Sequence, residues 1–398
     1  MIKNALRTSL LFLFTILFLF LGDARADLLI GPFAISPTSL PAGFTATSAV
    51  KKPDGTVYIG GRSGNQAAYV TVSGSQASPV VSTINILPSL SVTQGGGNPL
   101  GFLSDVVVNA SGAIEFLGSS QSVISSTTSF GEATVWNENG VPTGLGLGVG
   151  GTQSLLVGGN SIGIYGGLRN GSFPVVGSLA AGNLTSLPMF PGSLGGGVTG
   201  VSSNGLTLTG HIDGTPAYWT ASVLGGGYTA HQFTIPGVTN PEGFVYGQSG
   251  NLAGGIYYDD TLEDFVGAVF DLTTGSSLIS FANLGPVIGG AFAATIAGQN
   301  VFAFNQDAAY GGSFFWVQGA PDIIRLSSLI GSSLPGLGTA VQIVDIFEGS
   351  LGILLAGNNG AFAVTSFQAS ANDVPEPTTL LLVGLGGAAM LRKRRRAN

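Results

Sequence analysis

The densest group of acidic side chains in the sequence lies in the stretch YYDDTLEDF. It contains four carboxylates, those of Asp259, Asp260, Glu263 and Asp264. Grouped carboxylates can supply the several oxygen ligands that Ca²⁺ requires, so a Ca²⁺-dependent adhesin is one hypothesis. The spacing matches neither an EF-hand nor an RTX repeat, and a solvated acidic loop between two strands explains the same residues. The sequence indicates no other cofactor.

The only two histidines, His211 and His231, stand twenty residues apart. Two imidazoles on neighbouring strands can form a metal pair or an acid–base pair, but lone histidines more often make a hydrogen bond or lie on the surface. The absence of Cys excludes thiol catalysis. One stretch, Gly159 to Gly163, matches G-x-S-x-G, but it falls in a glycine turn with no helix pattern after it, unlike a nucleophile elbow. We therefore expect a protein without enzymatic activity. The alternative, a polysaccharide hydrolase or lyase, requires two acids that converge across a cleft.

Charge is scarce and unevenly distributed along the chain. Only 8% of the 398 residues are charged and 44% are hydrophobic, which favours a folded core over disorder. Residues 27–373 hold five basic residues against eighteen acidic ones, a net charge of −13. A body this acidic repels phosphate backbones, so nucleic acid is excluded as a partner.

Short strands joined by glycine-containing turns would carry these residues. The clearest unit is GVTGVSSNGLTLTGHIDGTPAYWTAS, residues 197–222. Asn204-Gly205 and Asp213-Gly214 suit tight hairpin turns, because Asn, Asp and Gly tolerate a positive φ. Between the two turns, hydrophobic residues alternate with threonines, and this period of two predicts a β-strand. Ala217-Tyr218-Trp219 forms the next strand.

Seven such units can be aligned on a turn glycine, namely Gly55, Gly112, Gly159, Gly205, Gly250, Gly298 and Gly349. Their spacings of 57, 47, 46, 45, 48 and 51 residues are typical of propeller blades, which are short antiparallel sheets repeated every ~40–50 residues. We therefore predict an all-β fold, a seven-bladed β-propeller of four-stranded antiparallel blades, over residues 27–370. The segment Leu28 to Ser36 would add a strand to the last blade and close the ring. A β-helix or a β-sandwich array is the alternative fold.

Two units end on similar aromatic motifs, Ala133-Thr134-Val135-Trp136 and Ala217-Tyr218-Trp219. In this respect the body resembles the propeller repeats of bacterial extracellular proteins, which pair a turn glycine with a later Ala-aromatic-x-Trp. Aromatic side chains near loops can stack against sugar rings, but large side chains also fill the gaps between blades. We expect packing between blades to be the main role of the aromatic residues Tyr218, Trp219, Tyr257, Tyr258 and Trp316.

The first 26 residues have the three parts of a secretory signal peptide. Lys3 and Arg7 give the positive start, residues 10–21 form an apolar run, and Ala24 and Ala26 are the small residues of a cleavage site. We expect export by Sec-type machinery and cleavage after Ala26. An uncleaved membrane anchor is the alternative.

The C-terminal segment, residues 371–398, combines an apolar stretch with a basic tip. Residues 378–391 are uncharged, and as a helix they would span ~21 Å against a hydrocarbon core of ~30 Å. Such a short transmembrane helix suits temporary retention in a membrane. By the positive-inside rule, the cytoplasmic side would hold the five basic residues Arg392, Lys393, Arg394, Arg395 and Arg396. A buried core helix with a basic tip is the alternative.

The order of the motif Pro375-Glu376-Pro377, the apolar stretch and the basic cluster resembles the PEP-CTERM sorting signal. The resemblance implies that this Pro-Glu-Pro motif is recognised by an exosortase, a membrane-embedded enzyme that removes the tail. It also implies a Gram-negative bacterium, a transient stay in the inner membrane and release to the cell surface or extracellular matrix, often in connection with exopolysaccharide. Together with the predicted propeller, it favours an exported structural or binding module.

Overall fold

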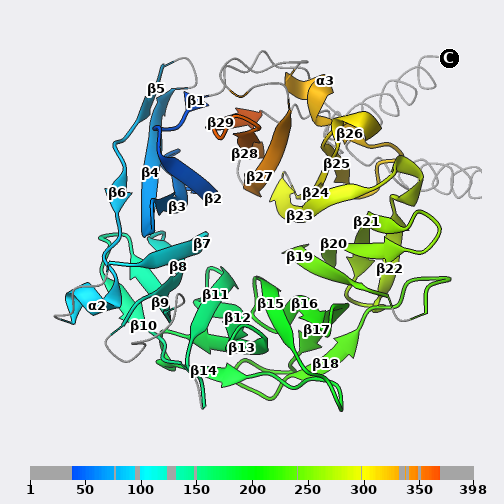
Figure 1. Ribbon diagram of the computed structural model, residues 1–398, viewed down its shortest axis with the longest axis horizontal. Helices are drawn as coiled ribbons and strands as arrows, with labels where there is room; N and C mark the ends of the chain where they lie inside the picture. The colour runs from blue at the N-terminus through cyan, green and yellow to red at the C-terminus, as the bar shows by residue number, and fades with distance from the viewer. Residues whose placement is uncertain are drawn as a thin grey trace, which may run out of the picture. The chain divides into compact units, whose positions relative to one another are not determined.

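The computed structural model describes residues 38–367 except residues 76–77, 95–98, 123–130, 148–149, 240, 297, 331–336, 338–339 and 348–350. The described chain forms seven antiparallel sheets, which succeed one another around a common centre (Figure 1). Each sheet is one blade, and its strands follow in order from the centre outwards. The predicted seven-bladed β-propeller is therefore confirmed, and the alternative folds are excluded.

Blades 1 to 4 cover the first half of the ring and follow the chain without a crossover. Blade 1 has a fifth short strand, β6, which also pairs with β4. The strands are, in blade 1, β2 (Phe44–Lys51), β3 (Val57–Ser63), β4 (Gln66–Ser75), β5 (Ser78–Val81) and β6 (Asn85–Ile86); in blade 2, β7 (Gly101–Val108), β8 (Ile114–Ser120), β9 (Glu132–Asn137) and β10 (Pro142–Gly144); in blade 3, β11 (Ser154–Gly159), β12 (Ile164–Arg169), β13 (Phe173–Ser178) and β14 (Asn183–Ser186); and in blade 4, β15 (Gly196–Val201), β16 (Thr207–Ile212), β17 (Thr215–Thr220) and β18 (Thr229–Gln232).

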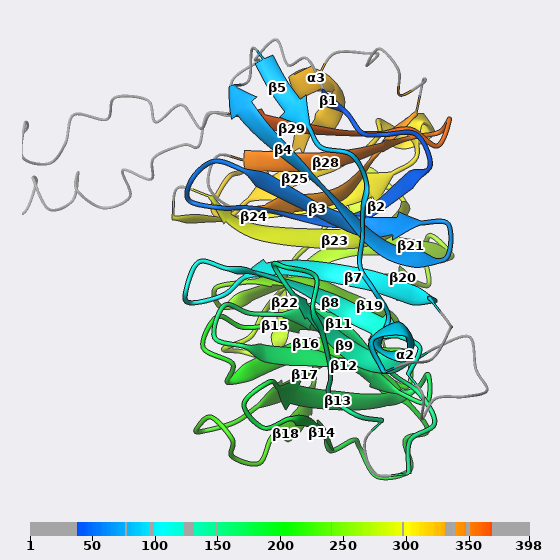
Figure 2. The ribbon, with the colours of Figure 1, turned by 90° about the vertical axis from the view of Figure 1, so that its left-hand side faces the viewer.

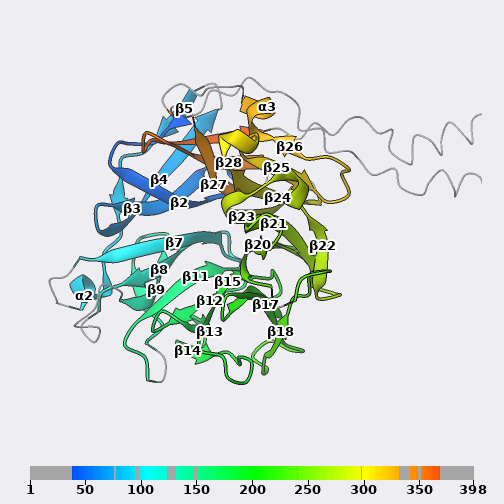
Figure 3. The same ribbon diagram turned by 45° about the vertical axis from the view of Figure 1, so that its right-hand side comes forward.

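Blades 5 to 7 complete the ring, and outer strands such as β14, β18 and β22 lie at its rim (Figures 1 and 3). The strands are, in blade 5, β19 (Gly243–Ser249), β20 (Leu252–Asp259), β21 (Asp264–Asp271) and β22 (Ser276–Ser280); in blade 6, β23 (Val287–Ile296), β24 (Gln299–Gln306), β25 (Phe314–Val317) and β26 (Ile324–Arg325); and in blade 7, β27 (Val341–Phe347), β28 (Leu351–Gly357), β29 (Phe362–Phe367) and β1 (Thr38–Ser39).

Helices in the described chain are short and peripheral. The helix α2 lies on the outer side of blade 2, beside β10 (Figures 1 and 2). The helical segments are α2 (Leu90–Thr93), α3 (Leu326–Ile330) and the two 3₁₀ turns η1 (Ala282–Leu284) and η2 (Ala308–Tyr310). Their scarcity agrees with the glycine-rich sequence, since each Gly in a helix costs about 1 kcal/mol relative to Ala.

The ring is closed by a strand from the N-terminal side of the body. The strand β1 pairs with β29, with Thr38 opposite Val364 and Ser39 opposite Ala363. Blade 7 is thus built from both ends of the described chain. The predicted closing segment, Leu28 to Ser36, lies outside the described residues, and the strand that closes the ring comes directly after it.

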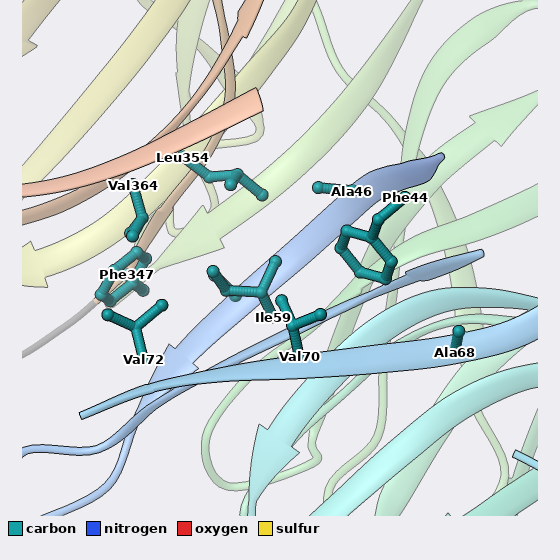
Figure 4. Packing of buried hydrophobic residues seen from close by; sticks show 10 residues of the cluster. Phe44, Ala46, Ile59, Ala68, Val70, Val72, Phe347, Leu354 and Val364 are labelled. Carbon is teal, nitrogen blue, oxygen red and sulfur yellow. The ribbon is translucent and has the colours of Figure 1, made fainter. Parts of the chain in front are cut away.

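Apolar side chains hold the closing blades together. One cluster combines Ile59, Val70 and Val72 of blade 1 with Phe347 and Leu354 of blade 7 (Figure 4). All five are buried, and full burial of each such side chain contributes about 1.5–3 kcal/mol. Similar clusters span blades 1 and 2, 2 and 3, 3 and 4, 4 and 5, and 5 and 6. The core of this fold therefore lies between the sheets.

Most of the predicted turn glycines lie where the sequence placed them. Gly205 has φ +68 between the two inner strands of blade 4, and Gly55, Gly112, Gly250 and Gly298 also have positive φ in the equivalent turns. The prediction that Gly159 is a turn glycine was wrong, because this residue belongs to the end of β11. The turn glycine of blade 3 is instead Gly163, with φ +77. Gly349 lies outside the described residues.

The innermost strand of every blade contains a shift in register relative to the second strand. The shift falls after Ala46 in β2, after Leu103 in β7 and after Ile343 in β27, and the other inner strands contain equivalent shifts. Such β-bulges bend a strand and leave backbone groups unpaired in the ladder. The repeated bulge thus gives every blade polar groups that need partners at the centre of the ring.

A glycine on the second strand faces the bulge in five blades. A Cβ atom added to Gly61 would lie 2.0 Å from Thr45 O, and one added to Gly118 would lie 2.0 Å from Phe102 O. The equivalent positions in blades 3, 4 and 5 are equally crowded by backbone and are occupied by Gly167, Gly210 and Gly255. In blade 7 the corresponding position is occupied by Leu355. These glycines therefore permit the close approach of two backbones.

We expect Gly118→Ala to lower the free energy of unfolding by about 1–3 kcal/mol, as overpacking does in other cores. The physical reason is that rigid backbone faces the new methyl group, so no side chain can yield. Urea denaturation checks this value. The matched control is Gly227→Ala, whose Cβ would meet nothing within 4 Å and whose effect should stay within about 0.5 kcal/mol. Equal losses in the two variants would contradict the proposed packing role.

Candidate functional site

Hydroxyl side chains at the bulges connect successive blades. Thr47 Oγ1 lies 3.0 Å from the Leu103 carbonyl oxygen of blade 2 and 3.3 Å from the Gly60 carbonyl oxygen of its own blade. Ser104 makes the equivalent pair of contacts between blades 2 and 3, and Thr199 makes it between blades 4 and 5. These hydroxyl groups therefore bind carbonyl oxygens exposed by the bulge of the next blade.

Between blades 6 and 7 an amide performs the same task. Asn305 Nδ2 donates to the Ile343 carbonyl oxygen at 2.7 Å, and Asn305 Oδ1 accepts from the Ile343 N–H at 2.8 Å. Ser313 Oγ donates to the same Oδ1 at 2.9 Å. One buried side chain thus satisfies both backbone groups of the residue that precedes the bulge.

Two acidic side chains converge at the centre, where blades 7, 1 and 2 adjoin. Ser48 Oγ lies 2.9 Å from Asp105 Oδ1 and 3.0 Å from Asp345 Oδ2. Asp345 accepts from the Ala49 N–H of blade 1 at 2.9 Å, and Asp105 accepts from the Gly159 N–H of blade 3 at 3.1 Å. We call Ser48, Asp105 and Asp345 the carboxyl cluster. None of its members was singled out from the sequence.

The carboxyl cluster requires a bound proton. A hydroxyl group has one proton, so Ser48 can donate to only one carboxylate, and the second close contact needs a protonated carboxyl group as donor. Desolvation raises the pKa of Asp105 to about 6. Desolvation, together with the negative charge of Asp105, raises the pKa of Asp345 to about 7. No basic side chain contacts either carboxyl group within the described part of the chain.

The contacts of the carboxyl cluster favour a structural role over catalysis. Besides the interblade bonds, Asp105 accepts from the Val106 N–H and Asp345 accepts from the Ile346 N–H, each at 2.8 Å. Both carboxyl groups are thereby committed to backbone donors, whereas a glycosidase pair must face a substrate. Through these bonds the carboxyl cluster links four consecutive blades, 7, 1, 2 and 3.

The two histidines lie in the same blade but are not brought together. His211 is on β16 and His231 is on β18, with β17 between them. The His211 ring packs edge-on against Phe244 of blade 5 at 4.9 Å, and burial lowers its pKa. His231 stacks on Tyr218 at 4.8 Å and shares a hydrogen bond with Thr220 at 2.9 Å. Their separate contacts do not form an acid–base pair.

The acidic stretch forms the hairpin turn between β20 and β21. Asp259 lies opposite Asp264, while Asp260 and Glu263 stand in the exposed turn. Asp259 Oδ1 accepts from the Thr261 and Leu262 N–H groups, at 2.9 and 3.1 Å. Within the described ranges no group of three Asp, Glu, His or Cys side chains has an arrangement that could hold a metal ion. The turn thus has the geometry of a solvated acidic loop, and calcium binding stays a prediction.

Most of the aromatic residues named above pack between blades, as expected. Trp219, Tyr257 and Trp316 are buried, and Tyr218 lies against Phe233 at 4.6 Å. The indole N–H of Trp219 donates to the Pro188 carbonyl oxygen at 2.7 Å. These rings are therefore not free to stack on a ligand.

A surface pocket of about 300 Å³ lies where blades 1 and 2 adjoin. One wall is the β3–β4 hairpin of blade 1, and the other consists of the start of β7 and the end of β8 in blade 2. The hairpin is fixed to blade 2 by a hydrogen bond from the Gly101 N–H to the Asn65 carbonyl oxygen, at 3.1 Å. The lining residues are Arg62, Asn65, Leu100, Gly101, Phe102, Ser119, Ser120, Gln121 and Gly131.

A family model described as a PEP-CTERM protein-sorting motif matches residues 373–396. The match confirms the motif predicted from the sequence and indicates an exported protein that an exosortase processes at the membrane. The residues assigned to sorting and export lie outside the described residues, namely Ala24, Ala26, Pro375, Glu376, Pro377, Arg392, Lys393, Arg394, Arg395 and Arg396. Among the described residues no helix is long and apolar enough to cross a membrane.

Solved propellers are similar to this chain at low sequence identity. The β-propeller domain of the Trilobed protease from Pyrococcus furiosus is 8% identical with a TM-score of 0.44, over 87% of this chain and 98% of that domain. Trypanosoma rangeli sialidase in complex with the inhibitor DANA is 12% identical with a TM-score of 0.40, over 89% of this chain. This chain covers only 60% of the sialidase. No curated protein matches it.

The carboxyl cluster predicts that the protein loses stability as pH rises. Its two folded-state pKa values, about 6 and about 7, lie above the unfolded value of about 3.9. The stabilising contribution is therefore fully present below pH ~4 and is lost as pH rises through ~6 to ~7. Melting temperatures measured from pH 4 to pH 8 check the trend.

Asp345→Asn tests the origin of this pH dependence. The amide oxygen can take the Oδ2 position and still accept from Ala49 and Ser48, but the bond from the Ile346 N–H is then lost, because the amide nitrogen cannot accept it. The melting temperature at pH 4 should therefore fall by on the order of a few degrees. Its pH profile should also be flatter than that of the wild type. The control Asp260→Asn removes a charge in the exposed hairpin turn and should leave the profile unchanged. An unchanged profile in Asp345→Asn would exclude the cluster as the cause.

Proposed function

We propose that this protein is an exported β-propeller that serves as a non-enzymatic binding module at the cell surface or in the extracellular matrix, with exopolysaccharide as its ligand. The PEP-CTERM motif supports the destination. The non-enzymatic role is inferred from the contacts of the two carboxyl groups in the carboxyl cluster. Asp105 and Asp345 converge on Ser48, and the backbone N–H groups that bind them leave them poorly placed to act on a substrate.

A binding role also agrees with the way the ring is held together. The polar side chains at the centre bind bulge carbonyls and N–H groups of neighbouring blades, so the ring is a rigid scaffold. Rigid scaffolds with variable loops on their faces are well suited to present a binding surface. The absence of Cys means that this rigidity depends on packing and hydrogen bonds, with no disulfide to resist unfolding outside the cell.

The sorting role predicts two processed ends. We expect the mature protein to begin at Asp27 and to lack the basic tail, because signal peptidase and exosortase remove the two transport segments. Mass spectrometry of protein isolated from the matrix of the producing cells measures both ends. In a variant with Pro375, Glu376 and Pro377 all changed to Ala, the tail should be retained and the protein should stay with the membrane fraction. A processed variant would contradict recognition of this motif.

The binding role predicts retention on the polysaccharide without its cleavage. Purified mature protein should co-sediment with exopolysaccharide from the producing cells, and chromatography of the supernatant should detect no shortened oligosaccharides. Heat-unfolded protein is the control for non-specific adsorption. Release of oligosaccharides would instead establish the alternative, a hydrolase or lyase on a propeller scaffold. Absence of any retention would overturn the binding role.

A further inference from the structure

The pocket between blades 1 and 2 has a cationic side chain, Arg62, that no other described residue pairs with. The other four basic residues of residues 27–373 have interactions within the described chain: Lys52 pairs with Glu138 at 2.8 Å, Arg325 donates to Gln306 at 2.6 Å, and Lys51 and Arg169 also have contacts. Arg62 is exposed and has no such partner in the described residues. Its guanidinium is therefore available to a ligand.

No acidic residue lines this pocket. The nearest acid along β9 is Glu132, and its Oε1 accepts from the Gly146 N–H at 2.9 Å and so is engaged within blade 2. The exposed acids Asp260 and Glu263 lie in blade 5, on the other side of the ring (Figure 1). Exposed charges beyond a Debye length of about 8 Å are largely screened at physiological salt. The pocket is thus locally positive although the body is acidic.

The remaining lining groups are neutral, and Asn65 and Phe102 are the exposed ones among them that suit a ligand. The side chain of Asn65 has no hydrogen-bond partner in the described chain. Phe102 keeps 36% of its surface exposed and lies opposite Ser119 across the β7–β8 ladder. An aromatic ring and an amide in one pocket suit a ligand that has an apolar face and several hydroxyl groups.

We propose that this pocket binds a carboxylated sugar residue, of the uronic acid type, in an acidic polysaccharide. Arg62 binds the carboxylate with its fork of N–H donors, a geometry that lysine cannot offer. Asn65 binds sugar hydroxyl groups, and Phe102 packs against the apolar face of the ring. A volume of about 300 Å³ is at the lower end of ligand pockets and suits a single sugar residue of a longer chain. This inference rests on the proposed binding function and specifies its ligand.

The test is a calorimetric titration of the purified mature protein with a short oligogalacturonate. Wild-type protein should bind it, and Arg62→Gln should weaken binding by about tenfold or more, as loss of a charge-assisted hydrogen bond does. Arg62→Lys keeps the positive charge but lacks the forked guanidinium, so its affinity should lie between those of the wild type and Arg62→Gln. Lys51→Gln is the control. It removes an equal charge at the end of β2, whereas Arg62 on β3 pairs with Thr45 near the start of β2, so this variant should bind like the wild type. Melting temperatures check that each variant is folded.

Two further ligands distinguish the possible failures. A neutral oligosaccharide of equal length should bind at least about tenfold more weakly than oligogalacturonate, and polyglutamate should not compete with it. Equal binding of neutral and acidic sugars, with no loss in Arg62→Gln, overturns the assignment of this pocket while the proposed function stands. Competition by polyglutamate would assign the pocket to acidic peptides, and this result would also overturn the assignment to a carboxylated sugar. Retention of no polysaccharide of any kind overturns the proposed function as well.

Discussion

The bulge in the innermost strand of each blade is the constraint on which the rest of the ring depends. A bulge removes backbone groups from the ladder of its own sheet, and buried backbone groups must find partners elsewhere. Here the partners come from the neighbouring blade, as Thr47, Ser104 and Asn305 show. The same irregularity that weakens a single sheet therefore connects consecutive sheets. A blade removed from the ring would leave these groups unsatisfied on both sides.

The turns and the number of blades could be predicted from the sequence because they depend on short local patterns. Contacts that form only when the ring closes could not. A tight turn needs a positive φ at one residue, and glycine adopts it readily, so glycines such as Gly205 mark the turns in the sequence. Because such a turn joins the two inner strands of a blade, the spacing of these glycines gave the number of blades. The error at Gly159 arose because three glycines, Gly158, Gly159 and Gly163, lie close together near the turn between the two inner strands, and of these only Gly163 has a positive φ. The carboxyl cluster joins residues 57 and 297 positions apart. No local signal marks such contacts, because only the closed ring brings the three strands together.

The incomplete repeat of the Trp motif has a physical explanation in an alternation of blades. Blades 2, 4 and 6 carry a Trp on the third strand, whereas blades 1, 3 and 5 carry a second glycine on the second strand. A Cβ at Gly60, Gly166 or Gly254 would lie 2.3–2.8 Å from a side-chain atom of the next blade. The space left by this glycine is filled by the following blade. The packing unit is therefore a pair of blades, which explains why neighbouring copies look different in sequence.

The closure of the ring is compatible with removal of both ends of the chain. The last described strand, β29, ends at Phe367, and the sorting motif begins at residue 373. On the other side, β1 begins at Thr38, beyond the signal peptide that we predict to end at Ala26. Neither cut would remove a residue from the β1–β29 pair or from the carboxyl cluster. The closed ring can therefore keep all its described hydrogen bonds after the two end segments are removed.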